Sequence, residues 1–536
     1  MLWADKGGIP MKELRLKELT PRQKLGMVMT AHIYEGPNRE ENTAYALEMI
    51  KNHALGAIWI GPGLTCFEET MAAVKEAADY PILIVCDAES GMPPYTVGRH
   101  NAIGCTGDPH LAYVFGKVTA VTARKKGYNV ICNPVLDMVT HNAVCGATVR
   151  GLGSDKYKVT ELALAEARGL HDGGVLSVAK HYPGSGTGLV DSHMAESSSP
   201  ATLEELLEFN LYPYLALLRE GLLDGIMTKH SRFHNIDPDY PASLSKKVIG
   251  IIRDQGFDGF AITDALVMMG IAAKFGARTC RGLAIANGND LALTWGPNQE
   301  GYESICETYD QGLIPDDRLD EAVSRVLAAQ HKTLSLSTDL ELTETDLEEF
   351  DSINKNGVFA KTDPGLSTAL DRDGRHYFVV LTENNVEIND AGKVNVDTLL
   401  KGWYRPDRIM EKLQELFPNS ISVAINQFPS PGQSMHLLER SVDYDDVVFV
   451  TFMESQAYVG RECLTSRIVS DIEALQITNR VSTLVHFGNP FVLEELPHIP
   501  RFLIGGLSTN SVEYTLDVLA GKYPAKGVLT YDVKLP

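Results

Sequence analysis

The first part of the chain alternates short apolar runs, rich in β-branched residues, with stretches of helical periodicity. Stretches such as Glu161 to Leu170 and Leu203 to Leu218 place leucines and alanines on one face of a helix. The apolar runs are Gly26 to Ile33, Gly56 to Ile60, Pro81 to Asp87, Val130 to Asp137, Leu176 to Tyr182, Leu223 to His230, Gly259 to Asp264 and Asp290 to Trp295. Strand and helix units repeated in this way predict an α/β fold, a (β/α)8 TIM-like barrel.

Polar side chains gather where these runs end. They are Asp87, Glu89, Asp137, Lys180, His181, Lys229, His230 and Asp264. In a barrel all these ends converge on one mouth, where barrel enzymes carry their chemistry. The alternative, an open doubly wound sheet, would spread them along an edge. The pattern favours the barrel and predicts a functional site at its mouth.

The pattern changes after Leu334. Residues 335–370 are acidic and polar and are expected to be a linker, with a helical part around Asp346 to Phe350. Residues 371–536 show a second alternation, with helices at Asp407 to Leu416 and Ile468 to Ile477. Its strands are expected at Tyr377 to Leu381, Ile421 to Asn426, Asp446 to Phe452, Val481 to Phe487, Phe502 to Ile504 and Val528 to Tyr531. We therefore predict a catalytic barrel over residues 1–334 and a smaller α/β sandwich domain over 371–536.

Composition excludes several classes of partner. With 48 basic and 70 acidic residues the net charge is −22, which disfavours nucleic acid and anionic membranes. No apolar run is long enough for a membrane helix, and Met1 to Lys17 lacks the apolar centre of a signal peptide. We expect a cytoplasmic protein, although a mature secreted form without its leader would have the same sequence.

The eight cysteines stand at irregular spacing, without a CxxC pair or a cysteine-histidine cluster. Cys86 and Cys132 lie in predicted buried strands, which suits reduced thiols better than disulfides. We expect no structural metal and no cofactor.

A series of short motifs resembles glycoside hydrolase family 3, in its β-N-acetylhexosaminidase branch. In chain order they are Asp87-x-Glu89-x-Gly91, Asn133-Pro134-Val135-Leu136-Asp137, Arg150-Gly151-Leu152-Gly153-Ser154-Asp155, Lys180-His181-Tyr182-Pro183-Gly184, Asp191-Ser192-His193, Met227-Thr228-Lys229-His230, Pro241-Ala242-Ser243-Leu244-Ser245, Gly256-Phe257-Asp258-Gly259 and Thr263-Asp264. Phe487-Gly488-Asn489-Pro490 resembles part of the C-terminal sandwich domain of that family. The resemblance implies a retaining exo-β-glycosidase, a small carbohydrate substrate ending in N-acetylglucosamine, and no cofactor.

The resemblance assigns three catalytic residues. Asp264 would be the nucleophile that forms a covalent glycosyl-enzyme, although an aspartate after a strand is also a frequent helix cap. His193 would be the general acid/base, oriented by Asp191 two residues earlier; a solvated loop pair is the simpler interpretation of Asp-x-His alone.

The same comparison assigns substrate binding. Asp87 would accept hydrogen bonds from sugar hydroxyls, and Lys180, His181 and Arg150 would donate them. An internal salt-bridge network at the mouth is the alternative for these residues. His230 is assigned to substrate contact, with a buried histidine satisfied by neighbouring backbone as the alternative. Asp137 is expected to be structural.

The chain departs from the family pattern at two places. Ser185 stands where the pattern has histidine, and Thr187-Gly188 stands where it has Asp-Thr, in a glycine-rich loop expected to move over bound sugar. After Gly91 the family has an arginine where this chain has Met92-Pro93-Pro94-Tyr95, and Arg99 is the nearest candidate. Both departures bear on substrate choice.

Three alternatives stay open. Glu462, in Gly460-Arg461-Glu462-Cys463-Leu464, could be the acid/base of a β-glucosidase-like enzyme. A histidine acid/base does not repel phosphate as a carboxylate would, so a β-N-acetylglucosaminide phosphorylase fits the same residues. A carbohydrate-binding homologue that has lost catalysis is the third.

Overall fold

The computed structural model describes residues 11–140, 147–184, 190–337, 339–382, 384–388, 394–398, 404–454 and 463–536. The chain forms two compact units, the first comprising Met1–Thr96, Asp108–Ala147 and Gly151–Phe350, the second Val97–Gly107, Thr148–Arg150 and Asp351–Pro536. Two short segments of the first half of the sequence therefore belong to the second unit. The division predicted from the sequence used consecutive ranges and did not include such segments.

The first unit is built on a parallel sheet whose strands all coincide with predicted runs. In spatial order they are β11 (Phe260–Thr263), β9 (Gly225–Thr228), β7 (Leu176–Tyr182), β6 (Val130–Ile131), β3 (Leu83–Cys86), β2 (Ala57–Ile60), β1 (Met29–Ile33) and β12 (Ala292–Leu293). A parallel bridge between Ile262 and Leu291 joins β11 to β12, so the strands close into a ring. The predicted TIM-like barrel is confirmed, and Gly26 and Met27 of the first run belong to a helix instead.

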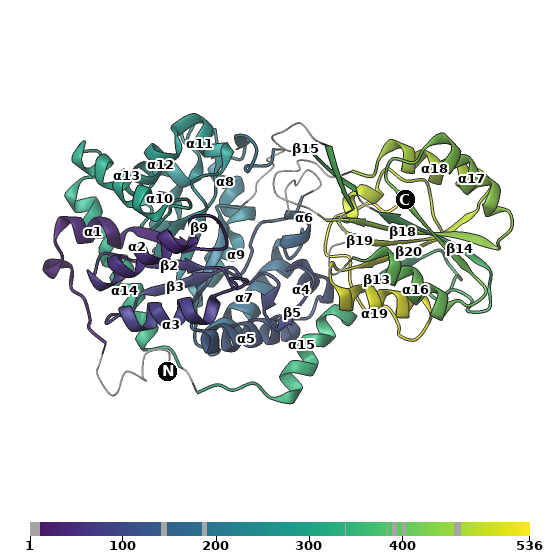
Figure 1. The fold of residues 1–536 in the computed structure, drawn as a ribbon, viewed down its shortest axis with the longest axis horizontal. Helices are drawn as coiled ribbons and strands as arrows, with labels where there is room; N and C mark the ends of the chain where they lie inside the picture. Colours follow the sequence, from purple (N-terminus) through teal and green to yellow (C-terminus); the bar gives the residue numbers. More distant parts are fainter. Residues whose placement is uncertain are drawn as a thin grey trace. The chain divides into compact units, whose positions relative to one another are not determined.

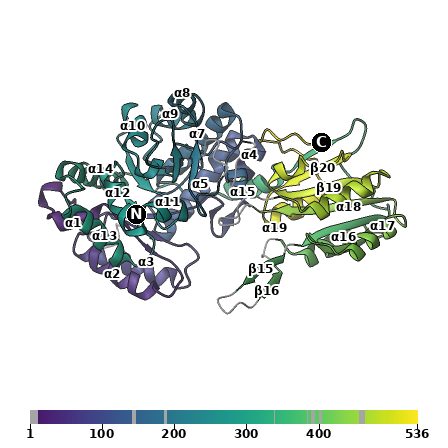
Figure 2. The same cartoon turned by 90° about the horizontal axis from the view of Figure 1, so that it is seen from above.

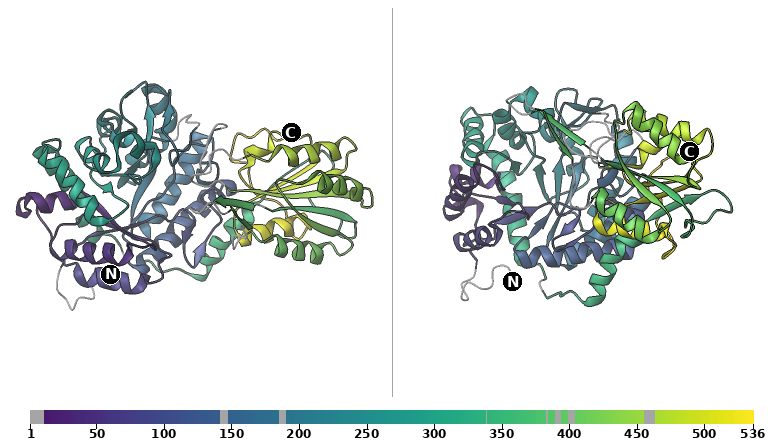
Figure 3. Two further views of the ribbon diagram at one scale, coloured as in Figure 1. Left: turned by 45° about the horizontal axis from the view of Figure 1, so that its top comes forward. Right: turned by 45° about the vertical axis from the view of Figure 1, so that its right-hand side comes forward.

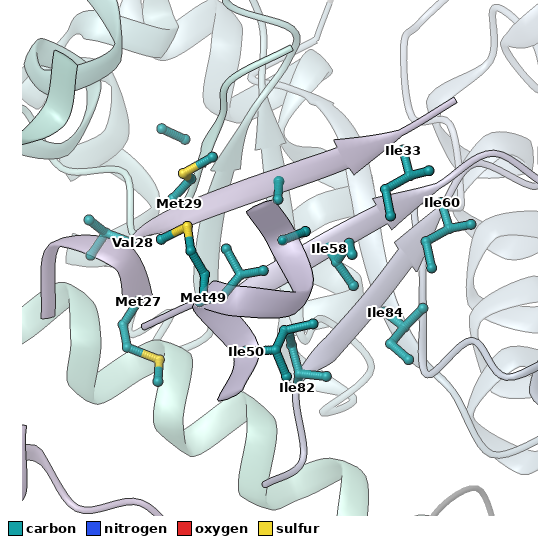
Figure 4. Close-up of a cluster of buried hydrophobic side chains, with 14 of the residues drawn as sticks. Met27, Val28, Met29, Ile33, Met49, Ile50, Ile58, Ile60, Ile82 and Ile84 are labelled. Atoms are coloured by element: carbon teal, nitrogen blue, oxygen red, sulfur yellow. The ribbon is translucent and has the colours of Figure 1, made fainter. Parts of the chain in front are cut away.

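Side chains alternate between the inside of the barrel and the layer of helices. Ile58, Ile60 and Ile84 pack outward into a cluster with Met49 and Ile50 of α2 (Arg39–Lys51), shown in Figure 4. The alternate residues form the barrel interior, namely Ala57, Trp59, Leu83, Val85, Val130, Cys132, Leu176, Val178, Met227, Phe260, Ile262, Leu291 and Leu293. These strands are buried on both faces, which explains why their sequences are continuous apolar runs.

Helices enclose these strands (Figure 3). They are α1 (Pro21–Met27), α2, α3 (Phe67–Ala77), α5 (Pro109–Lys126), α7 (Lys156–Asp172), α8 (Leu203–Glu205), α9 (Tyr212–Arg219), α10 (Lys246–Asp254), α11 (Met269–Phe275), α12 (Ala277–Ala286), α13 (Asn298–Asp310) and α14 (Asp316–Leu334), whereas most of α6 (Ala147–Arg150) belongs to the second unit. Helix α1 lies against α13 and α14 (Figure 2). The predicted helix Leu203 to Leu218 is divided into α8, a π-helical turn (Leu206–Asn210) and α9, because Pro213 stands in the first turn of a new helix.

Short paired strands accompany the barrel: β4 (Gly91–Met92) pairs antiparallel with β5 (Tyr95–Thr96), and β8 (Ser197–Ser199) pairs parallel with β10 (Ser231–Phe233).

The second unit contains a mixed sheet with helices on both faces. Its strand order is β13 (Phe359–Thr362), β20 (Arg501–Gly505), β19 (Val481–Gly488), β18 (Asp446–Met453), β14 (His376–Thr382) and β17 (Ile421–Asn426). Helices α16 (Pro406–Leu416) and α19 (Thr509–Leu519) cover one face, and α17 (Pro431–Ser441) and α18 (Ser466–Gln476) cover the other (Figure 1). Helix α4 (Asn101–Thr106) and an antiparallel hairpin of β15 (Asn384–Ile388) and β16 (Val394–Thr398) also belong to this unit.

One predicted strand in this half is absent, and one observed strand was not predicted. Val528 to Tyr531 is not a strand, because its backbone makes single hydrogen bonds, such as Val528 N to Cys105 O at 2.8 Å, rather than a ladder. The segment 335–370 contains the helical part predicted around Asp346 to Phe350, as α15 (Glu344–Asn356), and also β13, which pairs antiparallel with β20. The sheet of the second unit therefore begins before residue 371.

Within the described ranges, no helix combines the length and the apolar character needed to cross a bilayer.

Candidate active site

A buried lysine organises one side of the barrel mouth. Lys180, near the end of β7, is 1% exposed, and its ammonium group contacts the carboxylates of Asp87 and Glu89, the latter at 2.5 Å. A buried ammonium requires such compensation. The side chain of Asp87 is 50% exposed, so this carboxylate meets both Lys180 and the solvent at the mouth.

A second cluster surrounds His181, the next residue along β7. Its Nδ1 lies 2.6 Å from Asp137 Oδ2, and its Nε2 lies 4.0 Å from Asp264 Oδ2. The Lys229 ammonium lies 3.5 Å from the other oxygen of Asp137. Asp137 therefore fixes the orientation of the His181 ring, and the far nitrogen of that ring lies near Asp264.

Asp264 follows β11 and is held as a carboxylate. Burial raises its pKa, but the charges of His181 and His230, the backbone N–H of Ala265 and the charge of His193 lower it, and the balance is a pKa of about 2. Ala265 N donates to Asp264 Oδ1 at 2.7 Å, and the carboxylate keeps 23% of its surface exposed. An ionised carboxylate at a partly open position can act as a nucleophile.

Asp191 and His193 form a dyad on the loop after β7. Asp191 Oδ1 lies 2.8 Å from His193 Nδ1 and accepts a bond of 2.8 Å from the backbone N–H of His193. Asp191 is buried, whereas the His193 side chain is 23% exposed. Asp191 thus orients the imidazole ring of His193 through Nδ1.

The dyad loop is docked on the start of α11, which follows Asp264. Met269 N donates to His193 O at 3.2 Å, and Gly270 N donates to Ser192 O at 3.0 Å. A Cβ at position 270 would lie 2.4 Å from Ser192 O, so only glycine permits this approach. The contact fixes the dyad beside the loop that carries Asp264.

His230, assigned to substrate contact from the sequence, makes its contacts within the protein in this structure. The ring is fully buried, with Nδ1 2.7 Å from Ser243 Oγ and Nε2 2.9 Å from Ala265 O. Both nitrogens are engaged within the protein, and burial lowers the pKa of this histidine. His230 therefore supports the backbone next to Asp264.

The remaining expected residues either belong to the second unit or lie outside the described residues. Arg150, at the end of α6, belongs to the second unit, where its carbonyl oxygen lies 2.8 Å from His100 Nδ1. Arg99, also in the second unit, forms an ion pair with Glu454 at the end of β18. Residues 185–189, with the departures at Ser185 and Thr187-Gly188, and Glu462 lie outside the described residues.

The sequence placed Glu89, Asp137 and Lys229 at the barrel mouth but assigned no role to Glu89 and Lys229 and a structural one to Asp137. The position of each at the end of a strand of the barrel was the available signal. Pairing them with Lys180 and His181 requires the tertiary structure, since Asp137 is 44 residues from His181.

The arrangement combines an ionised carboxylate with a histidine that can donate and accept a proton, beside groups that can bind hydroxyls. Among the described residues there is no cluster of three or more His, Cys, Asp or Glu side chains suited to a metal ion.

Comparisons with known proteins identify the family of the barrel. Residues 13–329 match the glycosyl hydrolase family 3 N-terminal domain. The β-hexosaminidase LpqI of Mycobacterium tuberculosis is 30% identical over 350 residues, which cover 60% of this chain and 84% of that protein.

Two solved structures share the fold over both units. A glycoside hydrolase family 3 β-N-acetylglucosaminidase from Paenibacillus sp. superimposes with a TM-score of 0.78 at 23% identity, over 97% of this chain and all of that one. The β-glucoside phosphorylase BglX superimposes with a TM-score of 0.79 at 22% identity, over 96% of this chain and 94% of that one. At these identities the likeness concerns the fold.

Proposed function

The chain belongs to glycoside hydrolase family 3, and from this membership we propose that it is a retaining exo-β-glycosidase that releases terminal N-acetylglucosamine. The observation that carries the proposal is the ionised Asp264 beside His181, with the His193–Asp191 dyad docked on the helix that follows Asp264. The names of curated relatives, such as the β-hexosaminidase LpqI, support the N-acetylglucosamine preference.

In the first step, Asp264 attacks the anomeric carbon while the bond to the leaving oxygen breaks. Protonated His193 donates its Nε2 proton to that oxygen, so the aglycone leaves as a neutral alcohol. Asp191, at 2.8 Å from Nδ1, stabilises the imidazolium before the transfer and keeps the ring in one orientation afterwards. The product of this step is a glycosyl ester of Asp264.

In the second step, neutral His193 accepts a proton from water through Nε2 as the water oxygen attacks the anomeric carbon. The bond to Asp264 breaks, the carboxylate is released, and the sugar keeps its β configuration because two inversions have taken place. Since the pKa of Asp264 is about 2, the released carboxylate stays ionised and ready for the next turnover.

The sugar that is released would be bound by the polar side of the mouth. The half-exposed Asp87 would accept hydrogen bonds from hydroxyl groups, and Lys180 and His181 would donate them. Arg150 is proposed as a further contact from its match to the family motif.

The test compares His193→Ala, Asp264→Ala and a control, His110→Ala, at an exposed histidine of the first unit. The substrates are p-nitrophenyl β-glycosides of N-acetylglucosamine, N-acetylgalactosamine, glucose and xylose. We expect wild type to prefer N-acetylglucosaminide, and His193→Ala to lose roughly 10²- to 10⁴-fold in kcat on this substrate. Azide should rescue His193→Ala and give the β-glycosyl azide.

Full activity of His193→Ala would rule out the dyad as acid/base. Adding phosphate to the wild-type assay separates hydrolysis from phosphorolysis, because only a phosphorylase forms the sugar 1-phosphate at the expense of free sugar.

A further inference from the structure

Three aromatic rings stack at the barrel mouth, on the side away from the polar cluster. The centroids of His32 and Trp295 lie 4.8 Å apart with planes 8° apart, and those of Tyr34 and Trp295 lie 5.0 Å apart at 25°. His32 and Tyr34 complete the stack at 5.1 Å and 28°. We call these three residues the aromatic platform.

The pairing of the strands places the aromatic platform on the inner wall of the barrel. His32 pairs with Trp59, and Trp295 continues the alternation of Leu291 and Leu293; all of these partners are interior residues. His32 and Trp295 each lie two positions beyond the paired residues Thr30 and Leu293. The platform therefore stands above the apolar interior, where β1 and β12 reach the mouth.

The platform is uncharged and partly open. Burial lowers the pKa of His32 to about 4, so the ring is neutral near pH 7. His32 is fully buried, whereas Tyr34 is 38% exposed and Trp295 is partly exposed. Within the described residues, the buried His32 Nδ1 has no hydrogen-bond partner, and an unpaired buried nitrogen lowers the free energy of unfolding.

The backbone of Trp295 is held in a strained conformation. Its φ of 28° lies in the left-handed region, which is unfavourable for a tryptophan. Arg281 donates to Trp295 O at 3.3 Å, and Asn42 donates to the next carbonyl, that of Gly296, at 3.2 Å. These bonds keep the indole at a fixed place on the rim, as a rigid binding surface requires.

The order of the strands around the barrel relates the platform to the reaction. The polar cluster of the mouth lies at the ends of β3, β6, β7 and β9; Asp264 follows β11; the platform lies at the ends of β12 and β1. Asp264, where the glycosidic bond would be cleaved, thus stands between a polar side and an aromatic side. A substrate spanning the bond would have its two parts on these two sides.

We propose that the aromatic platform binds the leaving group of the substrate, and that this leaving group is a second pyranose ring whose C–H face stacks on Trp295 and Tyr34. The inference rests on the proposed glycosidase function and names the substrate class as oligosaccharides. Stacking suits this role, since an aromatic face removes the apolar face of a sugar from water and leaves its hydroxyl groups solvated.

The experiment compares two N-acetyl-β-glucosaminides with the full-length chain. N,N′-diacetylchitobiose has a pyranose leaving group, and the 2,2,2-trifluoroethyl glycoside has none. The variants are Trp295→Ala, Trp295→Phe and Tyr34→Ala. The control is Tyr309→Ala near the end of α13, which starts after Trp295 and runs away from the mouth.

For Trp295→Ala we expect kcat/KM on the disaccharide to fall roughly tenfold to a hundredfold, with less than about threefold change on the trifluoroethyl glycoside. Tyr34→Ala should show a smaller loss of the same kind, Trp295→Phe should retain most activity, and Tyr309→Ala should leave the ratio of the two substrates unchanged. Melting temperatures show which variants are folded, and the exposed Tyr34 decides the question if Trp295→Ala does not fold.

Equal losses on both substrates would overturn the proposal, because the rings would then support the fold or the released sugar. Unchanged kinetics on both substrates in Trp295→Ala and Tyr34→Ala would overturn it as well. A wild-type protein inactive on both glycosides would instead refute the proposed function, and with it the substrate class named here.

Discussion

Substitution of Gly270 tests whether the docking of α11 positions the acid/base. A Cβ at this position would lie 2.4 Å from Ser192 O and 2.7 Å from Ala195 O, whereas ordinary contacts begin at 3.4 Å. Relieving the closer contact requires a shift of about 1 Å, the difference between 3.4 and 2.4 Å. The shift would separate α11 from the loop that carries His193.

The magnitude follows from the contacts that would be lost. The bonds from Met269 N to His193 O and from Gly270 N to Ser192 O contribute about 1 kcal/mol each, so Gly270→Ala should lower the free energy of unfolding by about 1–3 kcal/mol. Displacing a catalytic group by about 1 Å can cost about 10²-fold in rate. We expect a loss of this order in kcat/KM on a substrate whose leaving group must be protonated.

The assay measures kcat/KM on two aryl N-acetylglucosaminides that differ in leaving-group acidity, because kcat/KM reports the cleavage of the leaving group and not the later hydrolysis of the glycosyl-enzyme. The loss should be large with p-methoxyphenol and small with 2,4-dinitrophenol, which departs without protonation. Gly250→Ala in α10 is the matched control, since a Cβ there meets no atom within 4 Å and alanine favours a helix over glycine. A folded Gly270→Ala protein with wild-type kcat/KM on both substrates would refute the reasoning.

Three further predictions concern charge. The carboxylate of Asp290 is fully buried and forms ion pairs with Arg318 at 2.8 Å and Arg253 at 2.7 Å. Asp290→Asn should therefore lower the free energy of unfolding by about 3–5 kcal/mol, which denaturant titration would measure. Burial lowers the pKa of His376, but the contact of its Nδ1 with Asp446 at 2.6 Å outweighs burial, so the pKa is raised. Protonated His376 therefore stabilises the folded state below the unfolded pKa near 6.5, and this stabilisation is lost as the pH rises through the higher pKa of the folded state. The melting temperature of the wild type should fall as the pH rises through this interval, and that of His376→Gln should not. The pKa of Asp264 is lowered from 3.8 to about 2, so the ionised carboxylate stabilises the fold above about pH 4, and this stabilisation is lost as the pH falls through 2. Asp264 therefore stays ionised between pH 4 and 7, and its labelling by an activated 2-deoxy-2-fluoro glycoside should show no loss from protonation of this carboxylate in that interval.

The sequence predicted the barrel because its strands are buried on both faces. Such strands read as continuous apolar runs, and all eight runs named from the sequence correspond to strands of the ring. Val528 to Tyr531 has the same apolar character but pairs with no strand, because β propensity does not supply a partner. The outer strand β13 was missed for the opposite reason, since it lies in a stretch that resembles a polar linker.

Candidate site residues could be named from local motifs, but the partners of each could not. His230 has the type and position of a substrate ligand, yet Ser243 and the carbonyl oxygen of Ala265 occupy both its nitrogens. Asp137 was expected to be structural, and its contact with His181 makes it a positioning group for the site. Proposals for the roles of Asp264, His193 and Asp191 rest on both the motifs and the geometry.

The sequence by itself determined the order of the strands and helices, the barrel, and which polar side chains stand at the strand ends, because these depend on local periodicity and on alternation along a strand. The tertiary structure alone decided which charges meet, how the dyad is docked through Gly270, and that His32, Tyr34 and Trp295 form one surface. Closing the ring brings β12 beside β1, so residues more than 260 positions apart become neighbours, and no local pattern contains that information.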